Sequence, residues 1–100
     1  MAGRRRGHAD HTADDERLVA LFRALGNPAR FRIFLELRKA EQVPGGQLLQ
    51  QLPLAQSTVS EHIRRLREVG LIVGESDGAA VRYTINEDMV DWIQESVSTF

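Results

Sequence analysis

Apolar residues recur every three or four positions along most of the chain, the spacing that keeps them on one face of a helix. This pattern predicts helices over about 14–25, 28–40, 47–52, 56–69 and 87–99. Gly26 ends the first helix, and Asn27 and Pro28 supply an N-cap and a first helical position for the second. Apolar side chains cover so much of 28–40 that we expect this segment to be the central helix of the core.

The helix predicted over 56–69 is apolar on one side and polar on the other. Val59, Ile63 and Leu66 form the apolar stripe. The rest of the surface carries Gln56, Ser57, Thr58, Ser60, Glu61, Arg64, Arg65 and Glu68. Short polar side chains let a helix backbone approach base edges, while guanidinium groups reach phosphates or guanine. A solvated amphipathic helix has the same pattern, so the interpretation depends on the next segment of the chain.

A β-hairpin is predicted directly after that helix, which Gly70 ends. Segments 71–73 and 81–85 are predicted strands, joined through an Asp-Gly turn signal. Alternation in the second strand directs Arg82 toward solvent. The short helix predicted over 47–52 and the helix over 56–69, joined by a tight turn, form a helix-turn-helix. With such a wing after it, this motif predicts a winged helix, a mainly α (α+β) fold with about five helices and one hairpin. We expect this domain to span 14–100 and to come after a disordered arm, residues 1–13.

The two terminal helices hold more apolar side chains than a small domain buries easily. Exposed apolar patches of this kind usually mark interfaces, so we expect both helices to pair with their copies in a homodimer. The expected interface residues are Leu18, Leu21, Phe22, Met89, Trp92, Ile93 and Val97. A two-fold dimer would hold the two copies of the helix over 56–69 about one DNA turn apart. The alternative is that both helices cover the back of a monomeric core.

The composition narrows the class of protein further. The net charge is −1, but arginines concentrate in the helix predicted over 56–69 and in the hairpin, while 86–100 is acidic, which permits one basic face. The absence of cysteine excludes disulfides and thiolate metal sites. The sequence has no nucleophile–base pairing or phosphate loop, so we expect neither an enzyme nor a cofactor. It also has no apolar run of about 18 residues and no secretory signal, so we expect a soluble intracellular protein.

Three segments resemble the ArsR/SmtB winged-helix repressors: Leu25–Arg30 (LGNPAR), Leu54–Ile63 (LAQSTVSEHI) and Leu66–Ile72 (LREVGLI). The resemblance runs from about residue 16 to 98. It implies a homodimeric bacterial transcription factor that binds an inverted-repeat operator in double-stranded DNA and blocks transcription, in the cytoplasm and at the nucleoid. It also implies that the first and last helices form the dimer interface.

Two departures from the family pattern concern metal sensing. Many members carry a Cys-x-Cys in the third helix, where this chain reads GQLLQ over 46–50. Others bind metals with Asp and His of the last helix, which here offers carboxylates and no His. We therefore expect no metal response. The signal could be another ligand, a partner protein, or nothing beyond the concentration of the protein itself.

Position by position, the resemblance gives the polar residues their expected roles. The base-edge readers would be Gln56, Ser57, Ser60 and Glu61, and the phosphate contacts Thr58, Arg64 and Arg65. On the wing, Arg82 would meet a phosphate or the adjacent minor groove. His62 is expected to be a partly buried structural histidine. His8 and His11 form a loose H-x-x-H, a weak metal signal. The competing hypothesis is a winged-helix protein-interaction module that binds no DNA.

Overall fold

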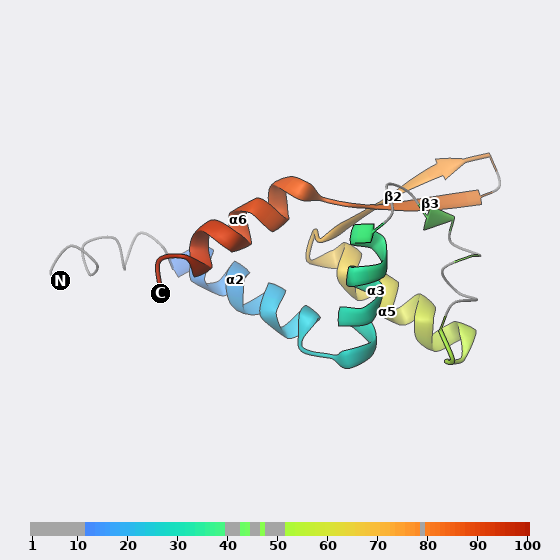
Figure 1. Cartoon of the computed structure of the whole chain (residues 1–100), viewed down its shortest axis with the longest axis horizontal. Helices are drawn as coiled ribbons and strands as arrows, with labels where there is room; N and C mark the ends of the chain where they lie inside the picture. The colour runs from blue at the N-terminus through green and yellow to red at the C-terminus, as the bar shows by residue number, and fades with distance from the viewer. Residues whose placement is uncertain (1–11, 40–42, 45–46, 48–51, 79) are drawn as a thin grey trace, which may run out of the picture.

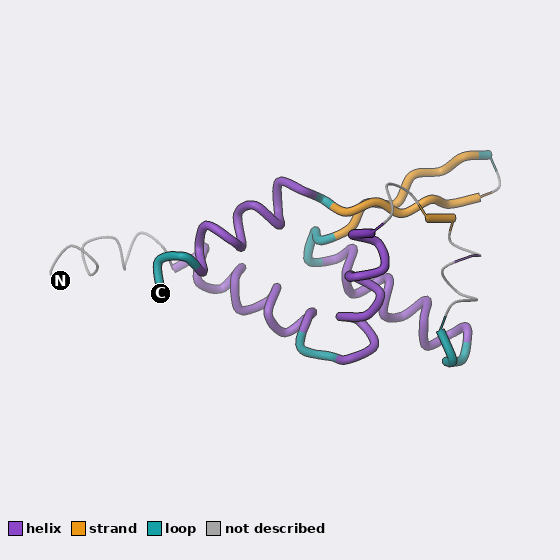
Figure 2. Tube along the Cα trace, in the orientation of Figure 1, coloured by secondary structure: helices purple, strands orange, loops and turns teal. Residues whose placement is uncertain are grey.

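The computed structural model describes residues 12–39, 43–44, 47, 52–78 and 80–100 (Figure 1). The elements in chain order are α2 (Thr12–Leu25), α3 (Pro28–Lys39), β1 (Val43–Pro44), α5 (Gln56–Glu68), β2 (Ile72–Asp77), β3 (Ala80–Ile85) and α6 (Glu87–Val97). Four of the five predicted helices are thereby confirmed, with ends within two residues of the predicted ones. Most of the helix predicted over 47–52 and nearly all of the predicted arm lie outside the described residues. The order of helices and hairpin is that of the predicted winged helix (Figure 2).

The core forms where α2, α3 and α5 meet the first residues of the wing. Its largest fully buried side chains are Leu21, Ile33, Leu37, Val59, Leu66 and Leu71. The apolar stripe predicted for α5 is confirmed, because Ile63 is buried as well. Helix α3 contributes Ile33, Phe34 and Leu37 to the core, as expected of its central helix, but one of its apolar side chains is exposed. Phe31 is 45% exposed, and its ring lies 6.4 Å from that of buried Phe34.

The wing is part of a three-stranded antiparallel sheet in the order β1-β3-β2. Val43 and Pro44, which lie between two predicted helices and in no predicted strand, pair with Tyr83 and Arg82 of β3. Arg82, which the alternation directs toward solvent, is half-buried. The hairpin is also longer than predicted, since β2 continues to Asp77, which pairs with Ala80.

Local hydrogen bonds explain where the helices begin and end. Asn27 Oδ1 accepts from the backbone N–H groups of Ala29 (2.9 Å) and Arg30 (3.1 Å), which confirms the predicted N-cap of α3. Ala55, before α5, offers no side-chain cap. Gly70, at φ +83°, ends α5 in the left-handed conformation that favours glycine. Asn86 caps α6 and donates from Nδ2 to the Gly70 carbonyl at 2.9 Å, which fixes α6 against the end of α5.

Helices α2 and α6 lie together at the end of the molecule opposite the wing tip (Figure 1), where the Arg17 guanidinium sits 5.1 Å from the centre of the Trp92 ring. Leu21 and Met89, expected in a dimer interface, are 0% and 7% exposed, so they belong to the core of the single chain. Among the other expected residues, Phe22 and Val97 are exposed, while Leu18, Trp92 and Ile93 are half-buried. None of the helices described is long and apolar enough to span a bilayer.

Candidate nucleic-acid interface

Helix α5 brings seven of the eight predicted DNA contacts onto one continuous surface. All seven side chains are exposed: Gln56, Ser57, Thr58, Ser60, Glu61, Arg64 and Arg65. The buried stripe beneath them fixes the orientation of the helix, because rotating it would bring charged residues into the core. We call this surface the recognition face. The eighth residue, Arg82, lies on β3 of the wing, where its pairing partners are Glu75 of β2 and Pro44 of β1.

The recognition face carries its own counter-ions. Arg64 forms ion pairs with Glu61, three residues before it, and with Glu68, four residues after it. Arg65 Nε lies 3.7 Å from Glu61 Oε2. The hydrogen bond from Arg64 lowers the pKa of the Glu61 carboxyl, and the same bond raises the pKa of Arg64. The ionised Glu61 carboxylate therefore offsets part of the charge that would attract DNA. The i, i+3 and i, i+4 spacing predicts these pairs, so sequence reasoning could have found the role of Glu68.

The remaining arginine of α5 connects the helix to the wing. The Arg67 guanidinium lies 6.0 Å from the centre of the Tyr83 ring on β3. Gly74, opposite Tyr83 in the sheet, makes room for both side chains, since a Cβ there would lie 3.1 Å from Tyr83 Cε1 and 3.3 Å from the Arg67 guanidinium. Arg67 thus packs between helix and wing and is a poor candidate for a DNA contact.

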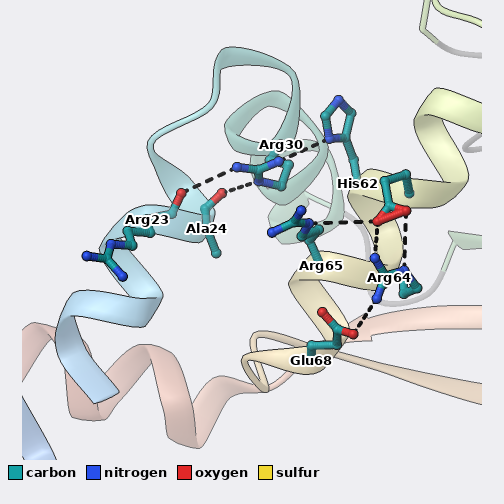
Figure 3. A network of polar contacts seen from close by, with 8 residues as sticks. Arg23, Ala24, Arg30, His62, Arg64, Arg65 and Glu68 are labelled. Atoms are coloured by element: carbon teal, nitrogen blue, oxygen red, sulfur yellow. Dashed lines mark hydrogen bonds and ion pairs between the residues drawn. The ribbon is translucent and has the colours of Figure 1, made fainter. Parts of the chain in front are cut away.

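A second polar network joins α5 to the ends of α2 and α3 (Figure 3). Arg30 Nε donates to the Ala24 carbonyl at 2.6 Å, and its Nη2 donates to the Arg23 carbonyl at 3.4 Å. Arg30 Nη1 lies 3.3 Å from His62 Nδ1. Burial lowers the pKa of His62, and the positive charge of Arg30 lowers it further. His62 is therefore a partly buried structural residue, as expected from the sequence. The role of Arg30 was not predicted, because it depends on three helices meeting.

Beside this network lies a surface pocket of about 240 Å³. Its lining comes from α2, from Arg30 of α3, and from the end of α5: Ala20, Arg23, Ala24, Arg30, Arg65, Glu68 and Val69. No group of three or more His, Asp or Glu side chains that could hold a metal ion occurs in the part of the chain that the structure describes. His8 and His11 lie outside that part.

Comparison with known proteins finds helix-turn-helix transcriptional regulators. Residues 25–75 match the family described as a helix-turn-helix domain. The HTH-type transcriptional regulator CmtR of Mycobacterium tuberculosis is 43% identical over 68 residues, which cover 68% of this chain and 57% of that protein. The chain thus spans somewhat over half the length of this relative. The HTH-type transcriptional regulator YgaV of Escherichia coli K12 is 31% identical over 81 residues, covering 81% of this chain and 82% of that protein.

The fold has a close counterpart among solved structures. An ArsR-like transcriptional regulator from Rhodococcus sp. RHA1 superposes with a TM-score of 0.80 over 88% of this chain and 82% of its own. Its sequence identity is 22%, so the likeness concerns the fold alone.

Proposed function

The chain belongs to the ArsR/SmtB-type winged helix-turn-helix regulators, and on this premise we propose that it is a homodimeric, sequence-specific DNA-binding repressor of transcription. It acts in the bacterial cytoplasm on an inverted-repeat operator. The observation that carries the proposal is the recognition face, on which a buried stripe holds seven polar side chains toward solvent, directly before a wing.

The recognition face has the chemistry that reading a major groove needs. Gln56, Ser57 and Ser60 supply amide and hydroxyl groups for base edges near the start of α5, and Glu61 can accept from a cytosine amino group. Thr58, Arg64 and Arg65 reach the phosphate backbone, and Arg82 adds a contact from the wing. Because phosphate contacts fix the register and base contacts carry the sequence information, the two groups of residues serve different purposes.

The exposed apolar side chains of α2 and α6 support the dimer. Val19 and Phe22 of α2 are 46% and 42% exposed, and Phe100, just after α6, is 84% exposed. They lie on or just after α2 and α6, as does exposed Val97, and these two helices lie at the end of the molecule away from the wing tip (Figure 1). Burying them against a second copy would remove apolar surface from water without covering the recognition face. The proposed interface therefore consists of Leu18, Phe22, Trp92, Ile93 and Val97, without Leu21 and Met89.

We further propose that the repressor does not respond to metal ions. The last helix contributes Asp88, Asp91 and Glu95, and carboxylates alone make a poor site for transition-metal ions, which favour imidazole and thiolate ligands. Asp88 and Asp91 are both exposed on α6.

One observation favours a second candidate function, a winged-helix module that binds protein rather than DNA. Glu61 and Glu68 hold Arg64, so the recognition face of the isolated chain is close to neutral. A face of this kind could dock on another protein through its hydrogen-bonding groups.

Selection from fragments of the source genome separates the two functions. Purified protein is mixed with the fragments, and the bound DNA is sequenced. The repressor predicts enrichment of a shared inverted repeat with half-sites about one helical turn apart. Bound fragments that share no common sequence, even at low salt, would favour the protein-interaction module.

A further inference from the structure

The pocket between α2, α3 and α5 has no role in the proposed reading of DNA. We propose that it binds a small organic anion, with a carboxylate held by arginines and a compact apolar body. Occupancy would draw Arg65 away from DNA, so the site would be an effector site. This last consequence rests on the proposed function, whereas the binding site itself does not.

The charges around the pocket favour an anion. Three arginines line it, Arg23, Arg30 and Arg65, against a single acidic residue, Glu68. That carboxylate is engaged by Arg64. A carboxylate bridging two arginines would form the charge-assisted hydrogen bonds that guanidinium groups make best.

Arg30 makes the pocket preorganised rather than merely basic. Its guanidinium is fixed by the carbonyls of Ala24 and Arg23 and by His62, so one cationic wall is in place before any ligand arrives. Figure 3 shows Arg65 extending from α5 toward the end of α2 where Ala24 lies. A ligand between these two arginines would lie across the junction of the three helices.

The rest of the lining selects an organic body over a bare inorganic ion. Ala20, Ala24 and Val69 contribute apolar surface, and a volume of about 240 Å³ leaves space beyond a carboxylate. The apolar part of a ligand would be removed from water there, which would stabilise the complex, whereas inorganic phosphate has no apolar surface to bury. An aromatic or short branched carboxylate combines both features.

Arg65 belongs both to the pocket and to the recognition face. A ligand carboxylate and a DNA phosphate would compete for the same guanidinium, so each would weaken the binding of the other by the same factor. The anion would thus relieve repression without any metal ion.

The binding site is tested first without DNA, by amide NMR of the full chain at constant ionic strength and about pH 7.5, above the ordinary pKa of histidine. The probes are benzoate, its neutral analogue benzamide, and inorganic phosphate. We expect benzoate to shift the amides of Ala20, Ala24 and Val69 saturably, with benzamide and phosphate each at least about threefold weaker.

Two pocket variants and one matched control complete this test. Arg23→Gln and Arg65→Gln each remove one pocket charge and should weaken benzoate binding about threefold or more. Arg32→Gln removes an equally exposed arginine of α3, one that pairs with Glu36 at 3.9 Å outside the pocket, and should leave binding unchanged. All three side chains are exposed, and the spectra themselves report whether each variant is folded. Absence of saturation, equal binding of benzamide or phosphate, or equal effects of Arg32→Gln and Arg65→Gln would each overturn the proposal.

The effector role is tested separately, on the duplex that the genomic selection yields. Saturating benzoate should weaken DNA binding about threefold or more in the wild type, and clearly less in Arg23→Gln, which leaves the recognition face intact. Benzoate binding without any effect on DNA affinity would overturn the effector role. If the chain binds no DNA at all, the proposed function fails, and the NMR titration still decides whether the pocket is an anion site.

Discussion

Arg30 of α3 and His62 of α5 face each other, with Arg30 Nη1 3.3 Å from His62 Nδ1. A guanidinium can only donate hydrogen bonds, so this contact requires Nδ1 to accept and the ring to be neutral. Protonation of the ring would place a hydrogen on Nδ1, so that two hydrogen-bond donors and two positive charges would face each other. Because Arg30 also holds the end of α2, the protonation of His62 affects the junction of three helices.

This contact predicts that the chain loses stability in mild acid. The pKa of His62 is lowered on folding, so the unfolded chain takes up a proton at a higher pH than the folded chain does. The free energy of unfolding should therefore fall as the pH drops below about 6.5, and level off below the folded-state pKa. In urea unfolding from about pH 7.5 to 5.5, His62→Gln should flatten this decline. The matched control replaces His8 and His11 and should keep it. An equally steep decline in the His62→Gln protein would contradict the role of His62.

The ion pairs on the recognition face predict a variant with increased affinity. Glu68→Gln removes a carboxylate that competes with DNA phosphate for Arg64, so binding to every duplex should tighten about two- to fivefold at low salt. Glu95→Gln changes the net charge equally but lies on α6, and it should have no comparable effect. Electrophoretic or fluorescence titration measures both variants. Equal gains in the two would show that only the net charge matters.

The two arginines of the recognition face should differ in importance. Arg64→Ala leaves Glu61 and Glu68 facing the phosphates without the arginine that they share. Arg65→Ala removes only a 3.7 Å contact with Glu61. Both variants should weaken binding to all sequences and reduce the salt slope by about 1, with the larger loss in Arg64→Ala. Titration of each variant through a salt series measures both quantities, and a larger loss in Arg65→Ala would contradict this ranking.

Gln56→Ala should behave differently from both, by changing the preference among sequences at one base position by about 1–3 kcal/mol. Binding to a panel of single-base variants of the operator measures this change. A uniform loss across the panel would assign Gln56 to the backbone instead.

The dimer is tested by one aromatic side chain on α2. Phe22→Glu places a charge in the proposed interface and should raise the dimer dissociation constant about 30-fold or more. Phe31→Glu is a close control, because Phe31 is 45% exposed, against 42% for Phe22, but lies on α3. Sedimentation or light scattering over a concentration series should show dissociation only for Phe22→Glu. A monomeric wild type would refute the dimer.

The sequence was informative wherever local chemistry decides the structure. Asn27 predicts the start of α3, and Gly70 the end of α5, because each supplies a backbone requirement that few residues meet. The three-residue and four-residue spacing of Val59, Ile63 and Leu66 predicts which side of α5 is exposed.

Contacts between distant segments were harder to predict. Val43 and Pro44 form a two-residue strand, too short to produce an alternating pattern. The apolar spacing of Leu21 and Met89 shows that they are buried, but it does not distinguish burial within one chain from burial between two. Arg30 contacts Arg23 and Ala24 of α2 and His62 of α5, and no local sequence pattern indicates contacts between such distant residues.

The central claim is that two copies of this chain recognise one DNA sequence. The most direct test measures the mass of the complex on the selected duplex, with a scrambled duplex alongside, through a salt series. We predict two chains per inverted repeat, clear preference over scrambled DNA, and affinity that falls steeply and linearly on logarithmic axes as salt rises. One chain per duplex, or equal binding to scrambled DNA at every salt concentration, would contradict the claim.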